Sequence, residues 1–224
     1  MTADGHVRME TPTEKAYGEH AHYDVALDRI ILTGGNLKIV TSKEILTARD
    51  SIEYYHGENK GIARGNALAQ FPEKEQLVQA DTLVAYFKPA AEKTITEKKE
   101  QKEEGKENIA LKRVEAEGNI LASGPKGVVT GDRGVYLEQT KTIEVFNNVK
   151  ITQDKNVIEG EYAKFNLDTN VAEMYTQPPH TSQTKPSKRI SGIIMPKSAK
   201  NTKTEDGPTN NKISDKSKDR HNPF

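Results

Sequence analysis

The chain has 224 residues, with 33 Lys and Arg balanced by 33 Asp and Glu, so its net charge gives no general reason to expect nucleic acid or an anionic membrane as a partner. Its hydrophobic content of 33% and aromatic content of 6% are low for a core that uses every residue, so part of the chain is expected to remain unfolded. Because it contains no cysteine, disulfides, thiolate metal sites and cysteine catalysis are excluded.

The amino terminus, MTADGHVRMETPTEKAYGEH, has neither the apolar core nor the cleavage-like site of a signal peptide. No apolar run approaches the ~20 residues that span a bilayer. We therefore expect a chain without a membrane span, beginning as a mature, truncated or mis-started protein.

Two short submotifs recur along the chain. The first is a small or turn-forming pair followed by an apolar, any, apolar triplet, and it occurs at Gly5-His6, Gly35-Asn36, Gly65-Asn66, Gly118-Asn119 and Asn147-Asn148. The second is an acid followed four residues later by an aromatic. It occurs at Glu19 and Tyr23, Asp50 and Tyr54, Asp132 and Tyr136, Glu161 and Phe165, and one residue looser at Asp81 and Tyr86.

The first submotif returns every thirty residues, at positions 5, 35 and 65. A fixed period of this size indicates stacked supersecondary units, none of which can bury its apolar face alone. Each unit is predicted to hold two short strands and two turns.

Strands are predicted from a period of two. Residues 142–151 place Ile143 and Val145 on one face and Glu144 and Lys150 on the other, as in a sheet with one wet side. Turn residues follow every eight to fifteen positions, too often for βαβ units. The chain is therefore predicted to be all-β, as a sandwich, roll or solenoid of repeated short antiparallel strands.

Two segments interrupt the repeat and set the predicted domain limits. Residues 88–112 form a mixed-charge insertion, expected to be a long hairpin loop with a solvated surface, within a repeat region spanning 1–176. Residues 177–197 are predicted to be a spacer followed by a terminal edge strand, and residues 198–224 a disordered tail.

Catalytic and metal-binding patterns are weak. His20 and His22 share a strand face, but a surface pair is favoured over a metal site because the sequence offers no nearby third ligand. The glycine-rich stretch 124–134 matches neither phosphate-binding spacing and is interpreted as a turn. The repeated acids occupy equivalent turn positions, which suits backbone capping better than catalysis. We expect no enzyme activity and no cofactor.

The alternation predicts a long apolar face. Its candidate lipid-binding residues are Val7, Met9, Ile30, Leu32, Leu37, Ile39, Ile120, Ile143, Val145, Val149 and Ile151. An ordinary dry sandwich core remains the alternative. Small residues among the aliphatics, and the lack of tryptophan, would suit a roll open enough for acyl chains.

Three stretches resemble the LptA/OstA-like family of periplasmic lipopolysaccharide-transport proteins. They are TGGNLKIVTSKEILTARDSIEYYHGENKGIARGNALAQ, VEAEGNILASGPKGVVTGDRGVYLEQTKTIEVFNNVKITQDKNVIEGEYAKFNLDTNVAEMY and RISGIIMPKS. The resemblance covers residues 5–197 and implies an open β-jellyroll that stacks end to end and shields the acyl chains of lipopolysaccharide between the inner and outer membranes. It also implies a periplasmic location, and as partners lipopolysaccharide and the other jellyroll components of the export machinery.

The resemblance leaves the component open. The chain could be the soluble bridge, an inner-membrane-anchored component or the amino-terminal domain of the outer-membrane translocon. A structural β-repeat adaptor is the competing class.

A late apolar segment suggests how copies associate. Its residues Ile190, Ile193, Ile194 and Met195 are predicted to form an edge strand. Such an edge can pair with the first repeat of another molecule, which gives a head-to-tail homo-oligomer.

Overall fold

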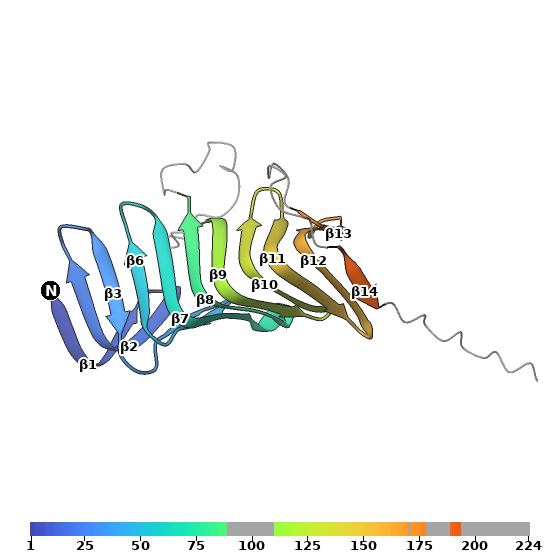
Figure 1. Cartoon of the computed structure of the whole chain (residues 1–224). Coiled ribbons are helices and arrows are strands. Elements are labelled where there is room, and N and C mark those ends of the chain that lie inside the picture. Colours follow the sequence, from blue (N-terminus) through green and yellow to red (C-terminus); the bar gives the residue numbers. More distant parts are fainter. Residues whose placement is uncertain (89–109, 170, 178–188, 194–224) are drawn as a thin grey trace, which may run out of the picture.

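The structure, a computed structural model, describes residues 1–88, 110–169, 171–177 and 189–193. These residues form one antiparallel sheet of 14 strands stacked along a single axis (Figure 1). In chain order the strands are β1 (Thr2–Glu10), β2 (Glu14–Asp24), β3 (Arg29–Thr33), β4 (Lys38–Thr41), β5 (Ile45–Thr47), β6 (Ser51–Tyr55), β7 (Lys60–Phe71), β8 (Gln76–Phe87), β9 (Leu111–Gly124), β10 (Gly127–Leu137), β11 (Thr142–Gln153), β12 (Asn156–Asn166), β13 (Val171–Tyr175) and β14 (Ser191–Ile193). A short 3-10 turn, η1 (Pro72–Lys74), joins β7 to β8.

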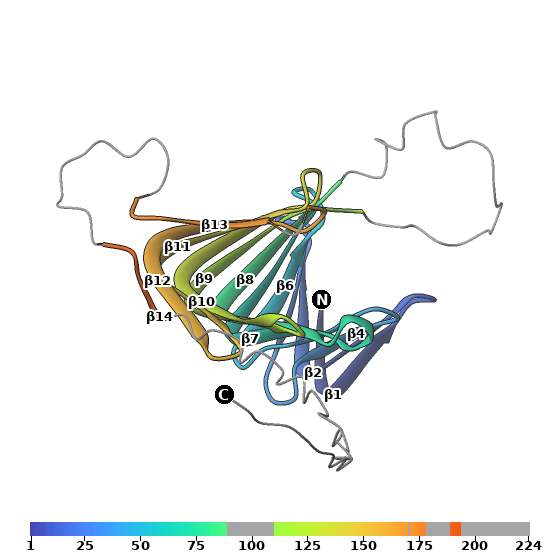
Figure 2. The same cartoon turned by 90° about the vertical axis from the view of Figure 1, so that its right-hand side faces the viewer.

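The sheet is folded over into two facing layers. Strand β2 pairs with β3 through residues 20–24 and with β4 through residues 14–17. Strand β7 likewise pairs with β6 near one end and with β5 near the other. We call the layer with β3, β6 and β13 the first arm, and the layer with β4, β5 and β14 the second arm. Figure 2 looks along the stack and shows the long strands crossing from one arm to the other at a bend.

The bend is made by the first submotif. Gly65 and Asn66 have φ of +83° and +47°, and Gly118 and Asn119 have +77° and +48°. At each such pair the register shifts, as between Gln79 and Thr82 of β8 opposite the β9 pair. An extra residue in a conformation open to Gly and Asn bends the strand. The pairs at Gly65-Asn66, Gly118-Asn119 and Asn147-Asn148 therefore lie within long strands, which corrects the expectation of turns between short ones, whereas Gly35-Asn36 lies in a turn between the short strands β3 and β4.

Small and aliphatic side chains fill the inside of the bend. One cross-strand row on the first arm runs through Ala21, Leu32, Ile52, Ala63, Leu83, Ala116, Gly134, Val145, Ala163 and Met174. Its members pack with second-arm residues in two buried clusters, one around Leu37 and Ala67 and one around Val149. The predicted all-β, open β-jellyroll architecture is confirmed.

The charged insertion sits between neighbouring strands. The Lys88 N–H donates to the carbonyl of Ala110 at 2.8 Å, where β8 ends and β9 is about to begin. Lys112 already belongs to β9, so the sheet resumes before the predicted end of the insertion. The remainder of the insertion, and the predicted tail at 198–224, lie outside the described residues.

Candidate functional site

The predicted apolar residues gather on the inner face of the bent sheet. Five of them are buried, with exposed fractions of 4% or less: Leu32, Leu37, Ile120, Val145 and Val149. Five more are partly buried and pack against these clusters: Val7, Met9, Ile39, Ile143 and Ile151. Ile30 is also partly buried, in register with Tyr23 and Tyr54.

The side chains of the inner face become less buried with distance from the bend. The row nearest the bend is almost entirely buried, whereas the next row of the first arm is only partly so. That outer row consists of Tyr23, Ile30, Tyr54, Gly61, Ala85, Val114, Tyr136, Ile143, Phe165 and Ala172. The inner face thus has a packed floor at the bend and half-exposed apolar residues on either arm.

Aromatic side chains line the outer part of the first arm. Tyr54 meets His56 edge-on with ring centroids 4.7 Å apart, and the centroid of the Phe87 ring lies 6.2 Å from that of Tyr54. The Tyr23 hydroxyl donates to Asp28 Oδ1 at 2.8 Å, and this hydrogen bond raises the pKa of Tyr23. This edge therefore combines apolar ring faces with polar tips, the combination that aromatics offer at a boundary between lipid and water.

The sequence pattern contained this aromatic row without assigning it to the inner face. Tyr23, Tyr54, Tyr136 and Phe165 are the residues found four places after the repeated acids, and alternation from the buried row places all of them inside. The looser pairing of Asp81 with Tyr86 is explained by β8. There Phe87 packs over Gly61, and Tyr86 faces out beneath the Arg113 guanidinium at 4.3 Å.

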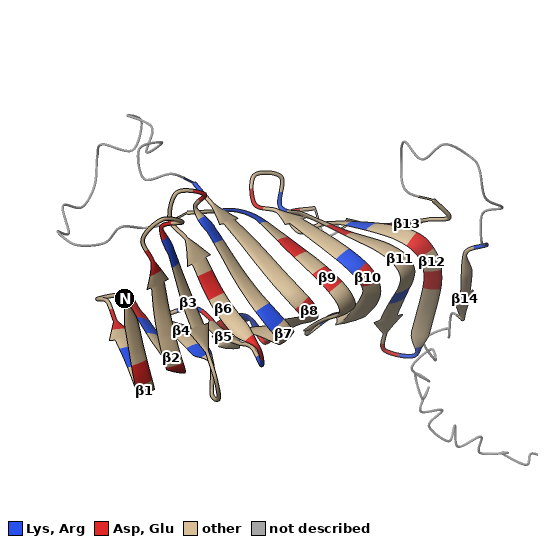
Figure 3. Ribbon diagram, turned by 60° about the vertical axis from the view of Figure 1, so that its left-hand side comes forward, with Lys and Arg blue, Asp and Glu red and all other residues tan. Residues whose placement is uncertain are grey.

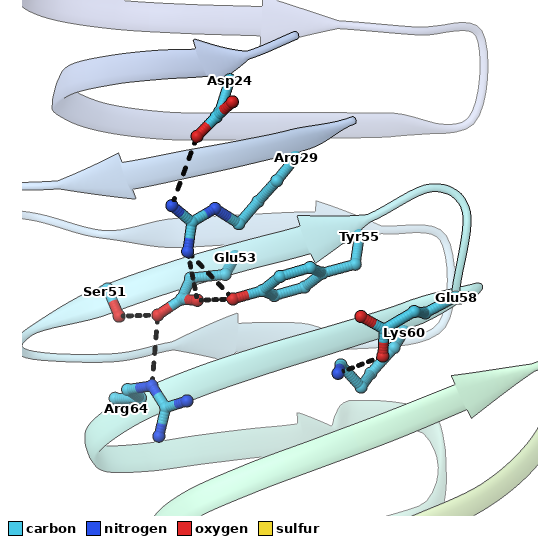
Figure 4. A network of polar contacts seen from close by, with 8 residues as sticks. All are labelled: Asp24, Arg29, Ser51, Glu53, Tyr55, Glu58, Lys60 and Arg64. Carbon is cyan, nitrogen blue, oxygen red and sulfur yellow. Dashed lines mark hydrogen bonds and ion pairs between the residues drawn. The ribbon is translucent and has the colours of Figure 1, made fainter. Parts of the chain in front are cut away.

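Charged residues recur along the strands (Figure 3), and alternation from the buried row places Glu53, next to Ile52, on the outer face. Glu53 is the center of the network drawn in Figure 4, with its side chain only 10% exposed. It accepts hydrogen bonds from the Tyr55 hydroxyl at 2.8 Å, the Ser51 hydroxyl at 2.9 Å and Arg64 Nε at 3.1 Å. Burial alone would raise the pKa of Glu53, but these three donors outweigh it and lower the pKa. The network ties β6 to β7 on the outer face and has no access to the inner one.

A second outer cluster lies near the carboxyl-terminal edge. The Tyr162 ring is 2% exposed and stacks between Phe146 and Tyr175, with centroids 5.1 and 5.5 Å away. Burial, followed by the charge of Glu144, raises the pKa of Tyr162 to about 12. These rings face away from the inner apolar residues, so they stabilise the end of the sheet.

The repeated acids lie at the bend and contact neighbouring strands. Asn119 Nδ2 donates to Asp81 Oδ2 at 2.8 Å, and Asn148 Nδ2 donates to Asp132 Oδ2 at 2.7 Å. Both carboxylates thus hold the bent pair of the next strand through its side-chain amide, whereas the sequence predicted hydrogen bonds to the backbone.

Metal-ligating side chains do not converge anywhere in the part of the chain that the structure describes. His20 Nδ1 lies 2.8 Å from Asp4 Oδ1 across β1 and β2. A hollow of about 170 Å³ lies at the same end of the sheet and is lined in part by His6, Tyr17 and Glu19. Within these described ranges no helix is long and apolar enough to cross a membrane.

Both ends of the stack present strand edges. In the described residues β1 pairs only with β2, while β13 and β14 both pair with β12, on the first and second arms respectively. Large apolar side chains are exposed at the carboxyl-terminal end, including Val171, Tyr175, Ile190 and Ile193. Ile194 and Met195, also predicted for this edge, lie outside the described residues.

A bent antiparallel sheet with an apolar inner face, a charged outer face and two strand edges defines a β-jellyroll of the binding or transport type. Residues 70–171, from the end of β7 to the start of β13, match the family model described as LptA/(LptD N-terminal domain) LPS transport protein. Residues 70–171 therefore belong to this family, and the resemblance to the LptA/OstA-like family is confirmed.

One similar solved structure is that of LptH, described as the LptA homologous periplasmic component of the conserved lipopolysaccharide transport device from Pseudomonas aeruginosa. It is 18% identical, covers 68% of this chain and 95% of its own, and has a TM-score of 0.49. No curated protein sequence matches.

Proposed function

We propose that the chain is a periplasmic lipopolysaccharide-binding bridge protein that shields acyl chains during transport from the inner to the outer membrane. The observation that carries the proposal is the half-exposed apolar inner face that flanks the two buried clusters, from Val7 of β1 to Met174 of β13. The description of the matched family supports lipopolysaccharide as the cargo.

The binding would be passive. Transfer of each methylene group out of water is favourable by about 0.8 kcal/mol, so an acyl chain lying along several strands gains affinity from length alone. The buried floor near Leu37 and Val149 keeps the arms apart at fixed geometry, and the partly buried residues beyond it, such as Ile39 and Ile151, contact the lipid. Energy for movement in one direction comes from another component.

The bridge role further requires end-to-end contact. The exposed edges of β1 and of β13 and β14 support head-to-tail assembly, or pairing with jellyroll components at either membrane, because an unpaired edge accepts another strand. Residues 1–176, with the 88–112 insertion, would form the lipid-carrying unit, and residues 177–197 would supply the assembly edge.

The test compares inner and outer residues on one strand. A photo-crosslinking amino acid at Ile151 faces inward, whereas one at the adjacent Lys150 faces out beside Glu159. Incubated with purified lipopolysaccharide and irradiated, the Ile151 variant should be labelled and the Lys150 variant should not. An Ile151→Asp variant should retain its circular-dichroism spectrum and lose lipid capture.

Equal labelling at the two positions would refute the proposal and favour the dry-core adaptor. Leu37 and Val149 are unsuitable for this purpose because both are at most 2% exposed, so a charge at either position would disrupt the fold itself.

A further inference from the structure

Along the bend, acidic side chains contact positive-φ residues of the following strands in one recurring arrangement, which we call the bend ladder. At Gly65, a Cβ atom would lie 2.3 Å from Asp50 Oδ2, in the segment that joins β5 to β6. At Gly118, it would lie 2.2 Å from Asp81 Oδ2 of the preceding strand β8. At both glycines a carboxylate from the preceding part of the stack thus rests on the open face.

The same arrangement holds at the two other internal bends. Glu19 of β2 covers Gly34, where a Cβ atom would lie 2.5 Å from the Glu19 Cβ. Asp132 of β10 accepts the hydrogen bond from Asn148 of β11. In all four cases the acid comes from the preceding part of the stack, so the bent pair presents a directional site for one carboxylate.

The first bend of the chain lacks this arrangement. Gly5 has the same φ as Gly65, +83°, yet no described atom lies within 4 Å of the position that its Cβ would take. Glu19, the acid on the neighbouring strand β2, is used at Gly34 on its other side. The carboxylate position at Gly5 therefore faces the free side of β1.

We propose that the β1 edge binds an antiparallel strand of a second protein that brings a carboxylate opposite Gly5-His6. The geometry specifies direction as well as charge, because every strand that supplies an acid within the sheet runs antiparallel to the strand that receives it. By analogy with β10 and β11, the residue after that acid would lie opposite Asp4, so a basic residue there adds charge complementarity.

The chain's own carboxyl-terminal edge does not meet these conditions. Both β1 and the β13–β14 pair run from the first arm to the second, so stacking with the arms aligned would make them parallel. The sequence between β13 and β14, residues 176–190, contains no Asp or Glu. A head-to-tail contact with another copy leaves the Gly5 position empty, and an acid-bearing antiparallel strand competes with it and ends the stack.

A peptide copying β10 tests the proposal. The peptide GVVTGDRGVYL, residues 127–137, contains Asp132 followed by Arg133. Within the sheet this segment pairs antiparallel with β11, which is the direction that the proposal requires. Labelled with a fluorophore and titrated with the full chain, it should bind saturably by anisotropy. The peptide with Asp132→Asn should bind about tenfold more weakly, because a charge-assisted contact is replaced by a neutral one.

Two protein variants locate the binding. Gly5→Ala places a methyl group where the incoming carboxylate would lie, so the native peptide should bind it about tenfold more weakly, like the Asn peptide. Gly57→Ala also meets open space, but in the turn between β6 and β7, and should bind normally. Far-UV circular dichroism checks that both variants are folded.

Three results would overturn the proposal: no saturable binding, equal affinity for the Asp and Asn peptides, or binding unaffected by Gly5→Ala. The measurement uses no lipid, so its outcome is independent of the lipid-binding role.

Discussion

Replacing Gly65 by alanine should lower the free energy of unfolding in two ways, through backbone strain and through a clash with Asp50. Gly65 has a φ of +83°, which an L-residue adopts at a cost of roughly 1–2 kcal/mol. Its new Cβ would also lie 2.3 Å from Asp50 Oδ2 and 2.5 Å from Asp50 Cγ, far inside normal contact. Relieving such overpacking costs a further 1–3 kcal/mol or so, giving about 2–5 kcal/mol in total.

Gly5→Ala is the matched control, because Gly5 has the same φ and open space around it. It should lose only the backbone part, about 1–2 kcal/mol. Unfolding in urea, followed by far-UV circular dichroism, measures both changes in the free energy of unfolding. The double variant Gly65→Ala with Asp50→Ala should recover most of the steric part, since the shortened side chain no longer fills the Cβ position.

The reasoning fails if Gly65→Ala and Gly5→Ala destabilise the protein equally. It fails as well if shortening Asp50 restores nothing, since the carboxylate would then not be the group displaced.

Two other predictions concern the outer network and the strand edges. Glu53 has a lowered pKa in the folded state, so its ionised form stabilises the protein above its ordinary pKa of 4.5 and this stability is lost as pH falls through the lower folded value. Urea midpoints measured from pH 6 down to pH 3 should therefore fall less steeply for Glu53→Gln than for the parent chain, and parallel curves would contradict the assignment. Static light scattering over a concentration series should show that the mass of the full chain grows with concentration. A variant lacking residues 189–224, and hence β14, should remain monomeric with its β-sheet circular-dichroism signal intact. If its mass still grows, β14 does not form the contact between copies.

The inner face could be predicted largely from local pattern. Alternation of apolar and polar residues holds on both sides of each bend, which is why Val145 and Val149, four residues apart across Asn147-Asn148, are both buried. The bent pair keeps Val145 and Val149 on the same face of β11, so counting by two gave the right side on the strand that carries the pair. The turn interpretation holds for Gly35-Asn36, between β3 and β4, but is wrong for the pairs inside long strands, because a turn and a bulge draw on the same residues, Gly and Asn.

The inward direction of the aromatic row could not be predicted, for a different reason. Tyr54 and Phe165 were visible as a repeat, yet whether they point in or out depends on the face of neighbouring strands that are distant in sequence. Tyr86 stands five residues after its acid, Asp81, instead of four, so alternation along β8 from Ala85 turns it outward and leaves Phe87 inside.

Local sequence is enough to locate the Gly-Asn pairs, to group side chains by face and to reveal the repeat, because these follow from residue conformation and the period of two. It does not reveal that the two arms face one another, that an acid rests on the bend of the following strand, or that the corresponding position at Gly5 is open. Those features depend on the register between strands, which is set by pairing across the whole stack and is not encoded in any one segment.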